Sequence, residues 1–595
     1  MPIYEAPTRD MQFLLHDVLK LQNYSNLPGF GEATPDVIDA FLEEAAKWHR
    51  DVLAPLNRTG DLEGCTRHED GSVTTPTGFK EAYQQFCENG FKSIAMDPEY
   101  GGQGLPLTLA YAINEMTSAA NQAFAMYPGL SAGAWHAIHQ NASDEQKRTY
   151  LPPMTEGRWT GTMNLTEPQC GTDLGLIRTK AVPQDDGTYK ISGQKIWISA
   201  GEHDMSENII HLVLARIEGA PEGIKGISLF IVPKFMVGED GSVGERNGVS
   251  CGGLEEKMGI HGNATCVMNY DEATGFLVGE EHKGMRAMFV MMNEARLGVG
   301  LQGLAAAEVA QQNAAMFARD RLQSRSVTGV KAPDKPADPI IVHPDVRRML
   351  MDTRAFTEGA RALTYWAALH EDMVHKAPDE TDRQRSKDYM ALLTPIIKAY
   401  QTHKGHQGAN DALQVFGGSG YCEEWGMSQF VRDVRIAMIY EGTNGIQALD
   451  LVGRKLMAEG GRYWQTFFAE IDAWCEENKG TSDDLDAHIE KLLAAKSELV
   501  EATQWMGMNA MANFDNAGAA SHDYLHLFGL VALGYMWAMM AKEAEAHKDE
   551  DDPFYANKLI TARYFFERVL PETTAHLAKL KTGADTMMAL PAEAF

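Results

Sequence analysis

The chain has few basic residues relative to acidic ones. Against 82 Asp and Glu there are 53 Lys and Arg, which gives a formal net charge of −29. Binding nucleic acid or an anionic membrane surface broadly requires a basic face. We therefore expect neither as a general partner, and an anionic substrate would need a local basic patch.

Cysteine is also scarce, and no two cysteines form a C-x-x-C pair. An odd number of scattered cysteines is typical of reduced intracellular thiols, so we expect no zinc or other metal site. The N-terminus carries Glu5 and Asp10 where a signal peptide would be positive and then apolar, which predicts a cytoplasmic protein. The seven cysteines are Cys65, Cys87, Cys170, Cys251, Cys266, Cys422 and Cys475.

Long hydrophobic runs are rare too. The most apolar stretch, Leu525–Ala541, contains His526 and two glycines and falls short of the ~20 residues that span a bilayer. A helix that is apolar all round is more often buried in a large soluble core. We therefore expect no membrane span.

The spacing of apolar residues changes along the 595 residues and predicts an α+β, mainly α, fold. After an N-terminal segment (1–34), helical spacing predicts an N-terminal helical domain over 35–158. Short alternating runs broken by glycine predict a β-domain over 159–284. Helical spacing returns over 285–460, interrupted by a proline-rich loop, and a further helical segment covers 461–595.

The most informative segment is Ile436–Asn444, in which a lone carboxylate, Glu441, stands in an apolar run that ends on glycine. A carboxylate among Ile, Met and Tyr is poorly solvated, so its pKa should rise and make it a usable base near neutral pH. The alternative is an acid near a helix start that is satisfied by backbone N–H groups.

Three further segments accompany it. Each is weak alone, but together and in this order they resemble the acyl-CoA dehydrogenase family of flavoproteins. The four segments are Asn164–Asp173, Lys195–Gly201, Phe416–Gly420 and Tyr440–Thr443.

The resemblance implies an N-terminal helical domain, a middle β-domain, a C-terminal four-helix domain and a C-terminal helical extension. It also implies FAD as cofactor, an acyl-CoA as substrate and an electron-transferring flavoprotein as electron acceptor. Glu441 matches the catalytic base that removes the α-proton. Arg296 and Gly442 match substrate-binding positions, and Thr443 matches a cofactor-binding position.

The remaining cofactor residues are also assigned by resemblance. Leu165 and Thr166 match the loop that hydrogen-bonds the pyrimidine end of the flavin, and Trp197 and Ser199 match the pair beside the ring. Thr172 matches a hydroxyl that meets the pyrophosphate.

Arg321 and Gln323 match a pyrophosphate-binding arginine and an adenine-side polar residue. Gln414, Gly417 and Gly418 match the segment that reaches FAD in a neighbouring subunit, although a helix C-cap explains these glycines equally well.

The chain departs from the family pattern at several positions. Met163 stands where many members have an aromatic residue, and Gln169-Cys170 and Ser324-Arg325 replace the usual pairs. In members that carry the base on an earlier helix, a glutamate precedes the arginine that matches Arg296. Here that position is Ala295, and Glu294 lies one residue away, so Glu441 is favoured as the base.

Over its whole length the chain most resembles bacterial members of the family that act on 3-(methylthio)propanoyl-CoA in the breakdown of dimethylsulfoniopropionate. A homodimer is expected, because the extension in longer members covers the surface where a second dimer would dock. Alternatives are a medium- or long-chain acyl-CoA dehydrogenase and an acyl-CoA oxidase, which would release peroxide under air. A non-catalytic scaffold with this fold would not be yellow.

Overall fold

The computed structural model describes residues 2–595, except for the side chains of residues 290, 293, 294 and 511. The chain divides into two compact units. One, here the strand-rich unit, comprises residues 44–105 and 116–298; the other, the helical unit, comprises residues up to 43, 106–115 and 299–595. Most of the chain is helical, so the predicted α+β, mainly α, class is confirmed.

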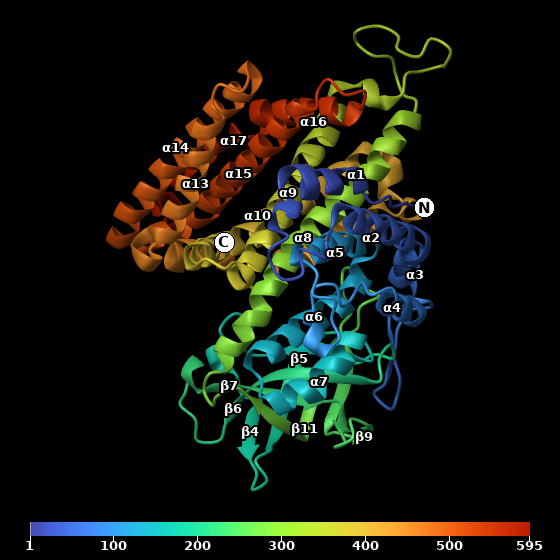
Figure 1. The fold of residues 1–595 in the computed structure, drawn as a ribbon, viewed down its shortest axis with the longest axis vertical. Helices are drawn as coiled ribbons and strands as arrows, with labels where there is room; N and C mark the ends of the chain where they lie inside the picture. The colour runs from blue at the N-terminus through green and yellow to red at the C-terminus, as the bar shows by residue number, and fades with distance from the viewer. Residues whose placement is uncertain (1) are drawn as a thin grey trace. The chain divides into compact units, whose positions relative to one another are not determined.

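A seven-stranded sheet forms the centre of the strand-rich unit (Figure 1). The strand order is β10-β11-β5-β4-β6-β3, and β7 pairs with both β11 and β6. Within these pairings, β3 and β4 run parallel to β6, and the other pairs are antiparallel. The strands are β3 (Trp159–Asn164), β4 (Lys180–Pro183), β5 (Tyr189–Ser199), β6 (Asn208–Ile217), β7 (Ile227–Pro233), β10 (Val249–Leu254) and β11 (Thr265–Val278).

Both faces of this sheet are buried, which explains why β6 and β7 read as almost continuous apolar runs. Along β6, Leu212 packs into one core and its neighbour Val213 into the other. Alternate strand residues point to opposite faces, so an apolar run of this kind fills two cores at once. The first core also contains residues of α6 (Gln122–Asn141) and α7 (Asp144–Glu156).

The N-terminal part of the strand-rich unit is mainly helical, as predicted, with one exception. Helices α3 (Ala54–Glu63) and α4 (Phe79–Glu88) are separated by a two-stranded hairpin of β1 (Thr66–Arg67) and β2 (Val73–Thr74). Strands of two residues are too short to produce an alternating apolar pattern. The sequence therefore gave no signal for them.

Long helices build the helical unit. The expected proline-rich interruption is a loop between α8 and α9, and α9 and α10 are joined by only a few residues. Helices α2 (Pro35–Trp48), α5 (Leu107–Ala120) and α8 cross the division between the units. The main helices of the helical unit are α8 (Gly284–Asp320), α9 (Pro344–Lys376), α10 (Glu380–Val415), α11 (Met427–Arg435), α12 (Asn444–Asp450), α13 (Arg462–Asn478), α14 (Asp483–Ala512), α15 (Phe514–Ala546), α16 (Pro553–Tyr564) and α17 (Glu572–Leu580).

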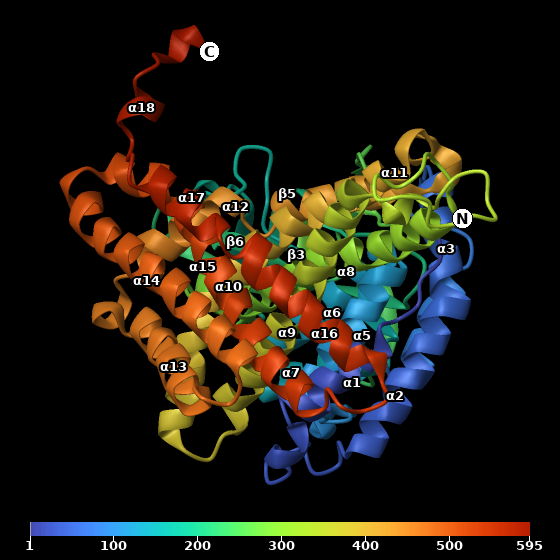
Figure 2. The ribbon, with the colours of Figure 1, turned by 90° about the horizontal axis from the view of Figure 1, so that it is seen from above.

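Helix α15 carries the apolar stretch Leu525–Ala541. By length and composition it could cross a membrane, but 94% of its most apolar 18-residue window is buried inside the structure. Trp537 Nε1 donates to the Ala355 carbonyl of α9 at 3.0 Å. Figure 2 shows α15 among helices α14, α16 and α17, with α18 (Asp585–Met588) extending away from them near the C-terminus. Such burial is typical of the core helix of a soluble protein.

A buried ionic cluster joins distant parts of the helical unit. Arg361 of α9, only 1% exposed, pairs with Glu115 at 2.8 Å, Glu308 at 2.9 Å and Asp10 at 2.5 Å. Asp10, in α1 (Thr8–Gln12), also pairs with Lys558 of α16. Burial raises the pKa of Asp10, but the Lys558 and Arg361 charges outweigh it and hold that pKa below its usual range. The buried carboxylates therefore need the charges of both Arg361 and Lys558 to stay ionised.

Candidate active site

The turn around Glu441 lies between α11 and α12 of the helical unit. Glu441 is half-buried and has a positive φ of 57°, followed by Gly442 at 79°. The left-handed region is costly for a residue with a Cβ, so surrounding contacts must hold Glu441 there. A Cβ at position 442 would lie 2.8 Å from Gln447 Nε2, which explains the glycine.

Three side chains hold this turn. Lys398 of α10 is fully buried, and its Nζ donates to the Gly442 carbonyl and to Asn444 Oδ1, both at 2.8 Å. Gln447 Nε2 donates to the carbonyl of Glu441 at 3.0 Å. Asn444 in turn donates to Thr402 Oγ1 at 2.9 Å. Helix α10 therefore fixes the backbone that carries the carboxylate.

Tyr440, the residue before Glu441, links the turn to helix α8. Its hydroxyl donates to Gln302 Oε1 of α8. Burial, with a smaller contribution from the charge of Glu441, raises the pKa of Tyr440 well above its usual range. Tyr440 is therefore neutral at physiological pH and acts as a hydrogen-bond donor.

In the strand-rich unit, Trp197 lies at a β-bulge. Cys266 pairs with Ile198 and Met268 with Lys195, so two residues of β5 oppose one of β11. Trp197 has a φ of +60°, and its side chain is 60% exposed. A bulge re-aims a side chain, and here it presents a large aromatic ring outward. Ser199, two residues on, is half-buried opposite Thr265.

The loop that begins at Leu165 is anchored next to this bulge. The Ile196 N–H donates to the Thr166 carbonyl at 3.0 Å, and buried Lys195 donates to the Leu165 carbonyl at 3.0 Å and to Glu167 at 2.8 Å. Burial raises the pKa of Glu167, but the Lys195 charge and hydrogen bonds from Thr179 and Arg178 outweigh it and lower that pKa to about 2. The structure thus brings Leu165, Thr166, Trp197 and Ser199 together. Thr172, farther along the loop, is exposed.

The other predicted cofactor residues lie in the helical unit and are exposed, whereas Gly442, predicted to bind substrate, is half-buried. Arg321 and Gln323 follow the end of α8, where the Gln323 N–H donates to the Asp338 carbonyl at 3.0 Å. Gly417 has a φ of +59° directly after Phe416, the C-cap of α10, so the helix-cap interpretation holds locally. The exposed set is Arg321, Gln323, Gln414, Gly417, Gly418 and Thr443.

Helix α8 carries Arg296, a predicted substrate-binding residue, and Glu294, the alternative to Glu441 as the base. Arg296 is 6% exposed. The side chain of Glu294, the alternative base, lies outside the described residues. The roles of Arg296 and Gly442 in substrate binding and of Glu441 as the base remain predictions.

The side chains present suit a flavin dinucleotide. An indole that is 60% exposed offers a flat apolar face to a ring system. Two half-buried residues provide hydroxyl groups near this indole: Ser199 at the end of β5, and Thr166 in the loop that is anchored to β5. In the helical unit, the exposed guanidinium of Arg321 provides the planar donor set that binds a pyrophosphate.

The chain thus combines a helical region, a sheet and a second helical region with a strained glutamate turn and an exposed tryptophan on a bulged strand. Sequence profiles of the acyl-CoA dehydrogenase family match the chain over most of its length. The N-terminal domain profile covers residues 37–158, the middle domain 162–273 and the C-terminal domain 282–457. A profile described as acetyl-CoA dehydrogenase C-terminal like covers 467–591. The chain belongs to the acyl-CoA dehydrogenase family, whose members are FAD flavoproteins.

Individual relatives resemble the chain from end to end. A 3-methylmercaptopropionyl-CoA dehydrogenase of Ruegeria pomeroyi is 43% identical, over 98% of this chain and 99% of the relative. A butyryl-CoA dehydrogenase of Syntrophomonas wolfei is 35% identical, over 100% of this chain and 99% of its own. Among solved structures, Caenorhabditis elegans ACDH-11 superimposes with a TM-score of 0.79 at 18% identity, covering 96% of this chain and 92% of that one, which supports the fold alone.

Proposed function

We propose that this enzyme dehydrogenates a short acyl-CoA, with 3-(methylthio)propanoyl-CoA as its preferred substrate and 3-(methylthio)acryloyl-CoA as product. The observation that carries this proposal is the 43% identity, over nearly the full length of both chains, to a relative named for that substrate. We also propose a place in dimethylsulfoniopropionate catabolism, the pathway that the sequence resemblance implies.

In the proposed reaction, the carboxylate of Glu441 takes the α-proton of the substrate. The backbone N–H of Glu441 donates to the thioester oxygen and stabilises its negative charge as the proton leaves. Bound FAD supplies the acceptor for the hydride from the β-carbon, because no protein side chain accepts two electrons. Lys398 and Gln447 hold the backbone in the required conformation. The α,β double bond then completes a 2-enoyl-CoA.

Cofactor binding is assigned to both units. In the strand-rich unit Leu165, Thr166 and Ser199 would hydrogen-bond the flavin, Trp197 would pack beside it, and Thr172 would meet the pyrophosphate. The helical unit contributes Arg321, Gln323 and Thr443, and in a dimer the segment of Gln414, Gly417 and Gly418 reaches the cofactor of the partner. We further propose that an electron-transferring flavoprotein reoxidises the enzyme in the cytoplasm.

The substrate proposal predicts a preference for short acyl groups. A straight-chain acyl group of similar length has nearly the shape of the methylthio substrate, and one methylene in an apolar pocket changes discrimination by only ~1–3 kcal/mol. Butanoyl-CoA should therefore be accepted alongside 3-(methylthio)propanoyl-CoA. The measurement is kcat/KM with the methylthio substrate and a series from four to sixteen carbons. A maximum at twelve carbons or more would identify a long-chain β-oxidation enzyme instead.

We also expect a homodimer in solution. The extension packs its own helix α15 against α9 within one chain, which leaves this side of the helical unit covered. Light scattering of the purified, FAD-loaded protein should give a mass near two chains. A mass near four chains would show that the extension does not prevent association of two dimers.

A further inference from the structure

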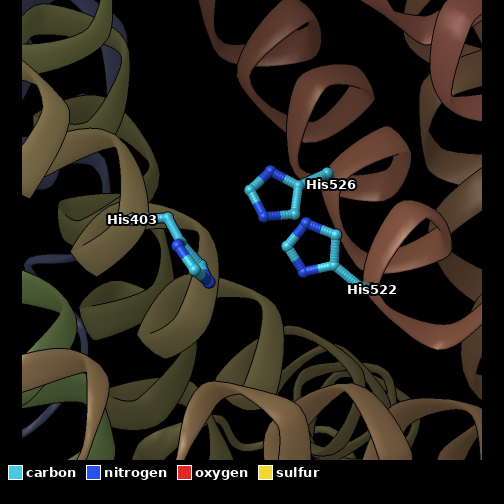
Figure 3. Close-up of side chains that lie close together, drawn as sticks. All are labelled: His403, His522 and His526. Atoms are coloured by element: carbon cyan, nitrogen blue, oxygen red, sulfur yellow. The ribbon is translucent and has the colours of Figure 1, made fainter. Parts of the chain in front are cut away.

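Three histidines from two helices converge in the helical unit. His403 lies on α10, and His522 and His526 lie on α15, outside the Glu441 turn. One ring nitrogen from each of the three histidines lies within 4.8 Å of the nitrogens from the other two. Figure 3 shows the rings of His522 and His526 projecting from one helix toward the helix that carries His403.

The backbone explains why these rings meet. His522 and His526 are four residues apart on a helix, a spacing that places both side chains on one face. Gly529 permits α15 to approach α10 closely, because a Cβ at that position would lie 2.5 Å from the ring of Tyr400. His403 follows Tyr400 by three residues on α10, and its ring centroid lies 5.0 Å from that of His526.

One ring nitrogen of the group is buried without a partner. His526 is 7% exposed, and its Nε2 has no hydrogen-bond partner in the structure. A buried polar atom without a partner costs about 1–3 kcal/mol. Coordination of a cation by that nitrogen would remove this cost.

From this geometry we propose that His403, His522 and His526 form a binding site for a divalent transition-metal ion, with Zn²⁺ as the best-fitting occupant. Three imidazoles suit Zn²⁺, Cu²⁺ and Ni²⁺, whereas Mg²⁺ and Ca²⁺ prefer oxygen ligands. Zn–N bonds of ~2.0–2.1 Å place tetrahedral ligand nitrogens ~3.3 Å apart. The distances between the ligand nitrogens must therefore decrease by up to about 1.5 Å when the ion binds. Because His522 is exposed and His403 half-buried, both can rotate, and water can fill the fourth position.

The protonation states of the three rings favour this site, whereas the neighbouring cations do not. Burial lowers the pKa of His403 to about 4 and also lowers those of His522 and His526, so the rings are neutral and ready to bind a cation at pH 7. Lys404 pairs with Glu572 at 3.0 Å, and the ring of His576 contacts Asp523 at 2.7 Å. Arg435 and Lys398 also face His403 and oppose the charge of the ion.

An ion at this position would join the C-terminal extension to α10. His403 is adjacent to Thr402, which accepts the hydrogen bond from Asn444 in the Glu441 turn. The site would therefore hold α15 against the helix that supports this turn. The sequence predicted no metal site, because that prediction rested on the cysteines alone, and their spacing is not that of a metal site.

The test uses tag-free, FAD-loaded enzyme freed of metal with EDTA and then desalted. Calorimetric titration with ZnCl2 should show one ion per chain at micromolar affinity or tighter, and Zn²⁺ should raise Tm. CoCl2 should give the visible absorption of tetrahedral Co²⁺. His403→Gln and His526→Gln should each weaken Zn²⁺ binding by at least about 100-fold and abolish the Tm increase.

Two further variants keep this test decisive. His522→Gln changes an exposed residue, so it should fold even if His526→Gln does not, and the same loss is expected. His406→Gln is the matched control, because His406 is on α10 but outside the group, and it should bind like the wild type. The proposal is overturned by binding only at millimolar Zn²⁺, by unchanged binding in the ligand variants, or by an equal loss in His406→Gln.

Discussion

Glu441→Gln is expected to leave the flavin bound and to lower kcat by at least about 10²-fold, the lower end for removal of a general base. Gln has nearly the same shape, so the turn held by Lys398 and Gln447 stays in place, but the amide cannot take a proton. Two measurements are needed. Anaerobic reduction by an acyl-CoA is monitored through the bleaching of the yellow flavin, and turnover is measured in the steady state.

Glu459→Gln is the matched control. Glu459 also has a positive φ, 51°, but it is exposed and outside the turn, so activity should be unchanged. If Glu441→Gln keeps near-full activity, another group such as Glu294 is the base. If the flavin is lost as well, the carboxylate also stabilises the fold of the turn, and the kinetic result no longer reports on proton transfer alone.

Arg361→Leu should destabilise the protein strongly. The change leaves Glu115, Glu308 and Asp10 buried next to an apolar side chain. Removing one partner of a buried ionic group costs about 3–5 kcal/mol, which in a unit of this size corresponds to a decrease in Tm of roughly 4–7 °C. Burial already raises the pKa of Glu115, so loss of the guanidinium favours its protonated form further.

The control for this change is an exposed arginine. Arg563 pairs with Glu567 on the surface of α16 at 2.9 Å, with the arginine side chain 73% exposed. Surface pairs contribute about 0–1 kcal/mol, so Arg563→Leu should shift Tm by no more than about 2–3 °C. Differential scanning calorimetry at one scan rate compares the two. Equal shifts would mean that the buried cluster is not needed for stability.

The parts of the fold that follow from periodic patterns were predictable. Alternation along β5, short apolar runs in β6 and β7, and helical spacing over the C-terminal half indicated the order of helical and strand-rich regions. Glu441 was found because it is a single charge in an apolar run. Lys398 stands in the same kind of run, Pro395–Tyr400, so the same signal could have found it.

Contacts between segments distant in sequence were not predictable from patterns. Nothing near Lys398 indicates that its ammonium reaches the Gly442 carbonyl. The exposure of Trp197 depends on a bulge whose extra residue is defined only against β11. His403 and His526 become neighbours only because α15 packs on α10 at Gly529. Each of these features depends on the pairing of two elements, which a local pattern does not encode.

The buried cluster of Asp10, Arg361 and Lys558 also bears on how the chain is made. Asp10 and Lys558 are separated by 548 positions. At about 5–20 residues per second, the ribosome needs roughly 30 s to 2 min to make the lysine after the aspartate. During that time the N-terminal helix lacks one of its permanent partners, and the apolar face of α10 lacks α15. We therefore expect nascent chains to expose apolar surface until α15 and α16 have been made.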